Sequence, residues 1–405
     1  MRLLVHDYGG YAFPYQLSLE LARRGHFVCH AYCADLVTTP PGVPEEADEP
    51  INLSVEPISL GAPLQKYDFF TRWRQERAYG RLIARQALEF GPDVVLSANT
   101  PLDAQRRLLT VCAREGVPFV FWLQDLLGVA AHRILRERIP VIGALIGSHY
   151  LRMERRLLRQ SQAVVAITPA FQTLLGDWGI PRKTTHVIGN WAPLDRLPVG
   201  EKTNAWSEEA GLESTFNFLY AGTLGMKHNP ERLLELARAF ADQPEVRILV
   251  ASQAQGAGWI QGRAAAEGLG NVVVLPYQSV DALPAMLAAA DVLVALLEPD
   301  AGLFSVPSKV LAYLCAERAL LLAVPGDNAA ARIVRESDAG LVVEPSDAAG
   351  FVDAAKRLYA DSALRVEMGR RARAHAEKAF SIDAIATRFE EILEQSNAAP
   401  AAGAP

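Results

Sequence analysis

The sequence of 405 residues lacks an apolar run long enough to cross a membrane, and it lacks an excess of positive charge. A spanning helix needs roughly 18 or more apolar residues in a row, so no segment is expected to cross a bilayer. The formal net charge of −6 argues against a protein that wraps a nucleic acid backbone. The amino-terminal MRLLVHDYGG has too short an apolar part for a secretory signal. We therefore expect a cytoplasmic protein with no nucleic acid partner.

Cysteine is scarce, and the common patterns of metal sites and hydrolase sites are missing. Cys29 and Cys33 are close in the sequence, but Cys112 and Cys315 are far away and no histidine cluster completes a zinc site. We expect all four thiols to be reduced and buried. The chain also contains no Asp-x-Asp, no His-Glu-x-x-His and no Gly-x-Ser-x-Gly. The sequence therefore predicts no metal site and no bound cofactor.

Short apolar segments alternate with longer amphipathic ones, which is typical of parallel α/β sheets. One series of predicted strands comprises RLLVHD, HFVCHAYC, DVVLSAN, PFVFWLQD and AVVAITP. A second comprises FNFLYAG, VRILVAS, VVVLP, DVLVALLE, ALLLAV and AGLVVEP. Because the chain is too long for one ordinary core, we expect two doubly wound, Rossmann-like α/β domains in tandem, with ligand-binding strand ends that face a cleft.

Breaks in this pattern set the expected domain boundaries. We expect a first domain at residues 1–192, a linker rich in proline, glycine and charge at 193–215, and a second domain at 216–380. Residues 381–396 are expected to form a C-terminal helix that packs back on the first domain, and residues 397–405 a disordered tail.

Two places in the second domain combine a predicted helix start with a lysine. In AGTLGMKHNPERLLELA, two glycines permit a tight turn after a strand, and Lys227 lies just before the helix. In LFSVPSKVLAYL, a proline suited to the first helical position is surrounded by Ser305, Ser308 and Lys309. Helix N-termini offer unpaired N–H groups and a positive dipole end, which suit phosphate oxygens. The two helix starts, each with a lysine, together favour a diphosphate site. A plain turn with a solvated lysine also explains the first segment.

These segments resemble the donor domain of retaining nucleotide-sugar glycosyltransferases of the GT-B fold, family 4 (group 1). NVVVLPYQSVDALPAMLAAADVLVALLEPDAGLFSVPSKVLAYLCAERALLLAVPGD and ESDAGLVVEPSDAAGFVDAAKRL extend the resemblance. In the first domain, DYGGYAFPYQLSLELARRGHFV resembles the family's glycine-rich first loop and helix, and FWLQDLLG, VVAITPAF and VIGNWAPLDRL follow in the expected order. The PSK helix start is most similar to members that act in bacterial exopolysaccharide and O-antigen assembly. The resemblance covers about residues 1–380.

The resemblance implies roles for particular residues. Lys227 and Lys309 would hold the diphosphate of the donor, and Gly9 and Gly10 would approach the donor from the first domain. The family's usual pair of glutamates is absent, because Phe304 and Ala312 occupy those positions. The remaining donor-binding residues would be Gly222, Thr223 and Gly225 in the first turn, Tyr277 and Gln278 near the base, and Gly302, Leu303, Phe304, Ser305 and Ser308 near the sugar.

Asp125 follows the apolar strand PFVFWL at its carboxyl end. A carboxylate there is placed to orient or deprotonate an acceptor hydroxyl. Alternatively, it caps the following segment or pairs with an arginine. We take Asp125, Lys227 and Lys309 as the candidate catalytic residues.

The segment HRILRERIPVIGALIGSHYLRMERRLLRQ surrounds a small apolar centre with arginines. Two interpretations remain open. Either the segment is a basic amphipathic surface that rests on anionic lipid, or Ile139–Ile146 is buried and the arginines are solvated. The arginines are Arg133, Arg136, Arg138, Arg152, Arg155, Arg156 and Arg159.

The sequence thus predicts a metal-independent, hexosyltransferase-like glycosyltransferase. It would transfer a sugar from a nucleotide-sugar donor to a saccharide acceptor in cell-surface polysaccharide synthesis, with retention of the anomeric configuration. The acceptor is expected to be lipid-linked. Such an enzyme would lie in the cytoplasm or peripherally on the inner face of the cell membrane. Two alternatives remain: a nucleotide-sugar 2-epimerase of similar fold, and a non-catalytic nucleotide-sugar-binding protein.

Overall fold

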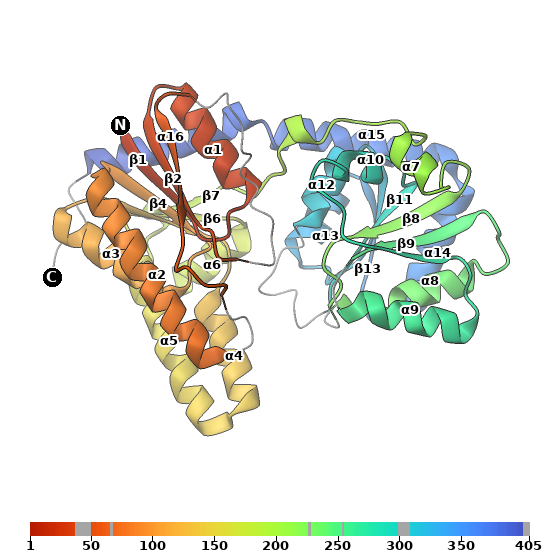
Figure 1. The fold of residues 1–405 in the computed structure, drawn as a ribbon, viewed down its shortest axis with the longest axis horizontal. Coiled ribbons are helices and arrows are strands. Elements are labelled where there is room, and N and C mark those ends of the chain that lie inside the picture. Colours follow the sequence, from red (N-terminus) through yellow and green to blue (C-terminus); the bar gives the residue numbers. More distant parts are fainter. Residues whose placement is uncertain (37–49, 65–67, 226–227, 253–254, 299–307, 400–405) are drawn as a thin grey trace. The chain divides into compact units, whose positions relative to one another are not determined.

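The computed structural model describes the chain except for residues 37–49, 65–67, 226–227, 253–254, 299–307 and 400–405. The chain divides into two compact units, each built around a parallel sheet with helices packed against it (Figure 1). Unit 1 comprises Met1–Asn190 and Ile382–Pro405, and unit 2 comprises Trp191–Ser381. The predicted pair of Rossmann-like α/β domains is confirmed.

Unit 1 contains a seven-stranded sheet in the order β3-β2-β1-β4-β5-β6-β7, with every pair parallel. The central strands β1, β4 and β5 are almost wholly buried, as expected for a parallel sheet covered on both faces. The strands are β1 (Arg2–Asp7), β2 (Phe27–Cys33), β3 (Leu53–Ile58), β4 (Val94–Ala98), β5 (Phe119–Leu123), β6 (Ala163–Ala166) and β7 (Thr185–Val187).

The helices of unit 1 connect these strands, and the last one comes from the far end of the sequence. They are α1 (Ala12–Arg23), α2 (Phe69–Phe90), α3 (Leu102–Glu115), α4 (Leu127–Arg138), α5 (Pro140–Gln160), α6 (Pro169–Asp177), the short 3-10 turn η1 (Arg182–Thr184) and α16 (Ile382–Ala398).

Helices α4 and α5 form a hairpin that projects from the rest of unit 1 (Figure 1). They approach closely because glycines lie where they cross. A Cβ on Gly143 would lie 1.9 Å from the carbonyl oxygen of Leu135, and a Cβ on Gly147 would lie 2.4 Å from Cα of His132. With these glycines on the inner side, larger apolar side chains of the tip are left outside. None of the helices in the described ranges is long and apolar enough to cross a membrane.

Helix α16 packs in unit 1 beside α1, β4 and β5. The ring centroid of Phe389 lies 4.7 Å from that of Trp122 on β5. Glu390 forms an ion pair with Arg24, at 2.9 Å, and a hydrogen bond with Nε2 of His26, at 2.7 Å. The helix thus closes the hydrophobic core of a unit whose other elements end about two hundred residues earlier in the chain.

Unit 2 contains a six-stranded parallel sheet in the order β10-β9-β8-β11-β12-β13. Its strands are β8 (Phe216–Ala221), β9 (Val246–Ala251), β10 (Val272–Leu275), β11 (Val292–Leu296), β12 (Ala319–Ala323) and β13 (Gly340–Val343). Its helices are η2 (Leu194–Arg196), α7 (Ala205–Glu209), α8 (Glu231–Ala239), α9 (Gln255–Glu267), α10 (Leu283–Ala288), α12 (Lys309–Cys315), α13 (Ala329–Glu336), α14 (Ala348–Ala360) and α15 (Ser362–Ala379).

Residues 193–215, expected to form a linker, are packed into unit 2. The Nζ atom of Lys202 lies 2.7 Å from Oδ2 of Asp291, and Arg318 donates a hydrogen bond of 3.0 Å to the carbonyl of Gly200. Asn204 caps α7 with a reciprocal hydrogen bond to its third residue. These polar contacts bind the segment to the second sheet, so the change of unit falls at residue 190.

Candidate active site

Lys309 is the first residue of α12, and its ammonium group lies at the carboxyl end of β8. The Nζ atom is 3.5 Å from the centroid of the Tyr220 ring. A Cβ on Gly222 would lie 3.4 Å from Nζ, and Gly222 has a φ of +112°, which L side chains rarely adopt. Gly222 therefore both turns the chain after β8 and leaves room beside the lysine.

The ammonium group of Lys309 is buried and makes no hydrogen bond to any described residue. Burial lowers its pKa well below the usual value for lysine. The face of Tyr220 provides a cation–π contact, which compensates only part of the cost of burying a charge without a counter-ion. An anion bound at this position would therefore be stabilised.

The turn that follows β8 lies around this lysine. The backbone N–H of Gly222 donates to the Ala251 carbonyl, that of Leu224 to Ser252 Oγ, and that of Gly225 to His228 Nδ1. Thr223 is exposed, and its carbonyl accepts a hydrogen bond from the Tyr220 hydroxyl. The structure therefore gathers Gly222, Thr223 and Gly225 in one turn next to Lys309.

The helix starts differ in detail from the expectation. Helix α8 begins at Glu231, its N-cap position is occupied by Pro230, and Asn229 before it has a φ of +44°, in the left-handed region. Ser308 is the exposed N-cap of α12, but its side chain makes no capping hydrogen bond. Lys227, Gly302, Leu303, Phe304 and Ser305 lie outside the described residues.

The residues expected near the base follow β10. Tyr277 is about half exposed. Gln278 is engaged on both sides of its amide, because its oxygen accepts from Trp206 Nε1 at 3.0 Å and its nitrogen donates to the Pro276 carbonyl at 2.9 Å. Gln278 thus holds α7 against this loop, a role that the sequence did not indicate.

In unit 1, the buried carboxylate of Asp7 at the end of β1 organises the glycine-rich loop. Its Oδ1 accepts from the backbone N–H of Gly9 and from Asn99 Nδ2, at 3.3 and 2.7 Å, and its Oδ2 accepts from the N–H of Tyr11 at 2.6 Å. Burial raises the pKa of Asp7 to about 6, against the lowering effect of the hydrogen bonds from Asn99 and from the backbone of residues 9–11. Gly10 has a φ of +64°.

The ring of Tyr11 folds back over Gly9. A Cβ on Gly9 would lie 2.1 Å from Cε2 of Tyr11, so any larger residue here would displace the tyrosine ring. The ring is partly exposed and stacks on Phe13, with centroids 6.0 Å apart. Sequence reasoning selected Gly9 and Gly10 but missed Asp7 and Tyr11.

Asp125 is exposed at the carboxyl end of β5. Burial raises the pKa of Tyr11, and the charges of Asp7 and Asp125 raise it further, which places Asp125 within electrostatic reach of the glycine-rich loop. Its neighbour Gln124 is buried and accepts a hydrogen bond of 2.6 Å from Asn190 Nδ2. The structure thus brings Asp125 to the same edge of the unit 1 sheet as Gly9 and Gly10.

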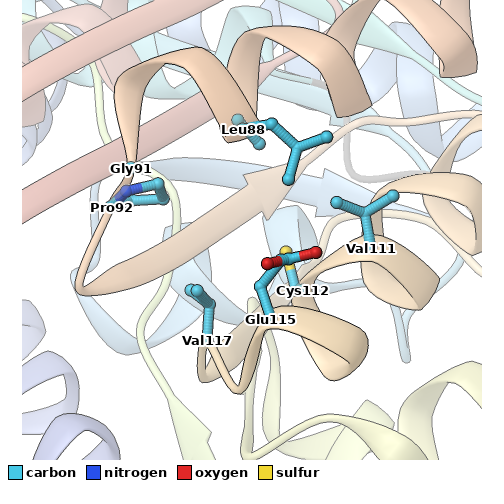
Figure 2. A pocket seen from close by; sticks show the side chains of 8 residues that line it. Leu88, Gly91, Pro92, Val111, Cys112, Glu115 and Val117 are labelled. Atoms are coloured by element: carbon cyan, nitrogen blue, oxygen red, sulfur yellow. The ribbon is translucent and has the colours of Figure 1, made fainter.

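An apolar pocket of about 120 Å³ lies at the other edge of this sheet (Figure 2). Pro92 and Val117 lead into β4 and β5, so the pocket is at the amino ends of these strands. Its only charged lining residue is Glu115, and none of the candidate residues lines it. Within the described ranges, no cluster of three or more His, Cys, Asp or Glu side chains could hold a metal ion.

Two models of protein families match this chain. The Glycosyl transferase 4-like domain matches residues 9–191, and Glycosyl transferases group 1 matches residues 203–375. Together with the two parallel sheets, these matches define a glycosyltransferase of the two-domain GT-B class. The chain belongs to the glycosyltransferases that combine a 4-like first domain with a group 1 second domain, so the resemblance seen in the sequence is confirmed.

Several known proteins are similar to this chain. WcaI of Escherichia coli (strain K12), assigned to colanic acid biosynthesis as a glycosyl transferase, is 26% identical over 160 residues, which are 39% of this chain and 39% of that protein. Sucrose-phosphate synthase from Thermosynechococcus elongatus has a TM-score of 0.73 at 18% identity, with 98% of each chain covered. HepE of Anabaena, solved with UDP and glucose, has a TM-score of 0.72 at 16% identity, covering 98% of this chain and 100% of that one. WaaG, a glycosyltransferase involved in lipopolysaccharide biosynthesis, has a TM-score of 0.65 at 15% identity, covering 96% and 99%.

Proposed function

We propose that this glycosyltransferase moves a sugar from a nucleotide-sugar donor to a saccharide acceptor, with retention of configuration, in the synthesis of a cell-surface polysaccharide. The observation that carries the proposal is the buried ammonium of Lys309, which has no counter-ion among the described residues of a group 1 domain. A diphosphate supplies the missing negative charge. The structure of HepE with UDP and glucose, and the assignment of WcaI to colanic acid biosynthesis, support the donor class and the pathway class.

Lys309 would stabilise the charge that develops on the departing diphosphate. A cation fixed in a buried site does so without reorganisation during the reaction. Lys227 is proposed as a second cation, because its neighbours Thr223 and Gly225 lie in the turn beside Lys309. Since lysines would carry this task, we propose that transfer needs neither a metal nor a cofactor.

Asp125 is proposed to orient or deprotonate the acceptor hydroxyl. Its support is its position, exposed at the carboxyl end of β5 and within electrostatic reach of Tyr11. Retention would follow if the acceptor attacks on the face from which the diphosphate leaves. We propose that unit 1 binds the acceptor and that unit 2 binds the donor.

A lipid-linked acceptor is supported by the tip of the α4–α5 hairpin. The alternative that Ile139–Ile146 is buried is wrong, because Val141 is 76% exposed and Leu145 is 67% exposed, and Ile139 and Ile142 are also exposed. The close packing of the helices through Gly143 and Gly147 explains why these larger side chains point outward. A cluster of exposed apolar side chains of this kind marks an interaction surface.

Arg133 pairs with Glu137 on α4, and the other six arginines of the hairpin divide into two groups. Arg155 stacks on the Trp178 ring at 4.8 Å, and Arg159 donates to the Trp178 carbonyl at 2.6 Å, so both hold the base of the hairpin against unit 1. Arg136 and Arg138 near the tip, and Arg152 and Arg156 on α5, are exposed. Apolar side chains at the tip with cationic ones around them suit the interface of an anionic bilayer. We therefore propose peripheral attachment to the cytoplasmic face of the membrane.

The test begins with thermal unfolding of the full chain in the presence of a panel of nucleotide sugars and free nucleoside diphosphates, because a bound ligand raises the melting temperature. The donor so found is then incubated with saccharide and lipid-linked saccharide acceptors, with and without EDTA, and the anomeric configuration of the product is determined by NMR. We expect transfer with retention that persists in EDTA. A donor consumed without any acceptor would indicate a 2-epimerase instead, and binding without turnover would indicate a non-catalytic protein. A complete loss in EDTA that Mg²⁺ reverses would contradict metal independence.

A further inference from the structure

The Gly9–Tyr11 loop and the turn at Asn99 are tied to one carboxylate. Both segments follow neighbouring central strands, β1 and β4, at their carboxyl ends. Each contains a residue in the left-handed region, Gly10 with φ of +64° and Asn99 with φ of +52°. Asp7 accepts hydrogen bonds from both segments, so a single side chain fixes two loops.

Burying the Asp7 carboxylate in this position is energetically unfavourable. Asp7 has no exposed surface, and no ion pair joins it to a lysine or arginine in the described part of the chain. The titratable groups around it are Tyr11 on the loop and Tyr79 on α2, whose pKa values its charge raises, with Asp125 acting on Tyr11 from β5. All of these leave Asp7 without a compensating positive charge.

We propose that Asp7 is a positioning residue of the active site, which holds the Gly9–Tyr11 loop in the conformation that binds substrate. This inference rests on the proposed function. A purely structural role predicts that the side chain stabilises the fold. The observed environment predicts the reverse, because ionising a carboxyl group that is buried without a cation is unfavourable.

The pKa of Asp7 in the folded protein, about 6, is above its ordinary value of 3.8. The folded state therefore binds more protons than the unfolded state between these values, and the contribution of Asp7 to stability is lost as the pH rises through about 6. At neutral pH the ionised carboxylate costs stability while it accepts the loop hydrogen bonds.

The variant Asp7→Asn distinguishes a role in positioning the loop from a role in stabilising the fold. The amide keeps the shape and removes the buried charge, but its nitrogen cannot accept, so one of the backbone N–H groups of the loop loses its acceptor. Asp93→Asn is the matched control. Asp93 accepts a backbone hydrogen bond of 2.7 Å from Arg2, but it does so at the amino edge of the same sheet.

We expect Asp7→Asn to lower kcat/KM for transfer at pH 7.5 by at least about tenfold and to leave the melting temperature equal to or above that of the wild type. Wild-type turnover should fall as the pH drops through about 6, where Asp7 takes up a proton, and the variant should lack this acid limb. Hydrogen exchange at the amides of Gly9 and Tyr11 should accelerate by about tenfold or more in the variant, without acceleration in the sheet. Asp93→Asn should change none of these measurements.

A lower melting temperature of Asp7→Asn together with faster exchange across the sheet would make Asp7 a structural residue and overturn the inference. Wild-type turnover with an unchanged acid limb would overturn it as well. If the wild type transfers no sugar from any nucleotide sugar, this result contradicts the proposed function but not the role of Asp7 in fixing the loop. The exchange measurement then still decides whether Asp7 fixes the loop.

Discussion

Replacing Lys309 with methionine removes a charge that the fold buries without a partner among the described residues. A charge-assisted hydrogen bond contributes about 1.5–3 kcal/mol, so we expect donor affinity to fall by about 10- to 150-fold. The melting temperature without ligand should stay the same or rise, since the unfavourable burial is relieved. Calorimetric titration with the donor measures the affinity. Lys356→Met, an exposed lysine on α14, is the control.

Unchanged donor affinity in a folded Lys309→Met variant would disprove the assignment of the diphosphate to this lysine.

The same ammonium predicts a pH dependence of binding. Burial lowers the pKa of Lys309 below that in the unfolded chain, so the unfolded state binds more protons and the contribution of this group to stability increases with pH until the unfolded lysine titrates. A bound diphosphate reverses the preference and favours the charged form. Donor binding should therefore take up a proton above the pKa of the free protein, and affinity should decline as the pH rises. Titrations in buffers with different ionisation enthalpies measure the uptake, which Lys309→Met should abolish.

Single residues differed in how well the sequence revealed them. Lys309 and Gly222 stand in local patterns of strand, glycine and helix start, and such patterns are visible in a few consecutive letters. Asp7 was missed because its role depends on Asn99, which is 92 residues away in the sequence. Gln278 remains a candidate near the base, and its side-chain amide also holds Trp206, a contact between segments that no local pattern encodes.

At the level of elements, the α4–α5 hairpin should bind anionic liposomes through its tip and its exposed arginines. Attraction of about 1 kcal/mol per arginine near an anionic surface falls with salt, whereas the apolar contribution of the tip does not. Changing Arg136, Arg138, Arg152 and Arg156 to Gln should therefore remove the salt-sensitive part of binding. Changing Val141, Ile142 and Leu145 to Ser should remove the part that persists at high salt. Co-sedimentation with liposomes of varied anionic content measures both.

If the wild-type protein does not bind anionic liposomes at low salt, this result would contradict membrane attachment and favour a soluble acceptor. Binding by both variants at the wild-type level would place the attachment on another part of the protein. Arg155 and Arg159 are left unchanged in these variants, because they contact Trp178 and their loss would disturb the hairpin itself.

The glycines between α4 and α5 should be intolerant of a methyl group. Alanine normally favours a helix over glycine by about 1 kcal/mol. At Gly143 the added carbon would clash with the backbone of Leu135, and such overpacking costs about 1–3 kcal/mol. Gly143→Ala should therefore lower the melting temperature. Gly258→Ala in α9, where no atom lies within 4 Å, should raise it or leave it unchanged, and equal shifts in both variants would contradict the close packing.

The strands that the sequence predicted are those with continuous apolar runs. Two edge strands, β3 and β7, were not predicted. In β3 only the first and last residues are buried, and β7 has just three residues, of which one is buried. A strand that is covered on one side contains few apolar residues in a row. Its position in the sheet is therefore determined by pairing with neighbouring strands and cannot be predicted from its own sequence.

At the level of the whole molecule, the two units should respond separately to damage in their cores. Phe389 on α16 covers Trp122 in unit 1, and Phe351 on α14 is buried in the core of unit 2. Removing a buried phenylalanine ring costs about 3–5 kcal/mol. Phe389→Ala should lower the unfolding transition of unit 1, followed by differential scanning calorimetry, and should spare that of unit 2, whereas Phe351→Ala should do the opposite. A single transition that shifts equally in both variants would show that the units unfold together.

The return of α16 to unit 1 has a consequence during protein synthesis. Residues 1–190 leave the ribosome first, but the helix that covers Trp122 follows only after residues 191–381. At about 5–20 residues per second, the nascent unit therefore waits roughly 10–40 s with part of its core open to water. We expect it to occupy chaperones during this interval. A premature stop codon shortly before residue 382 would leave every candidate catalytic residue in place and still yield a protein that aggregates.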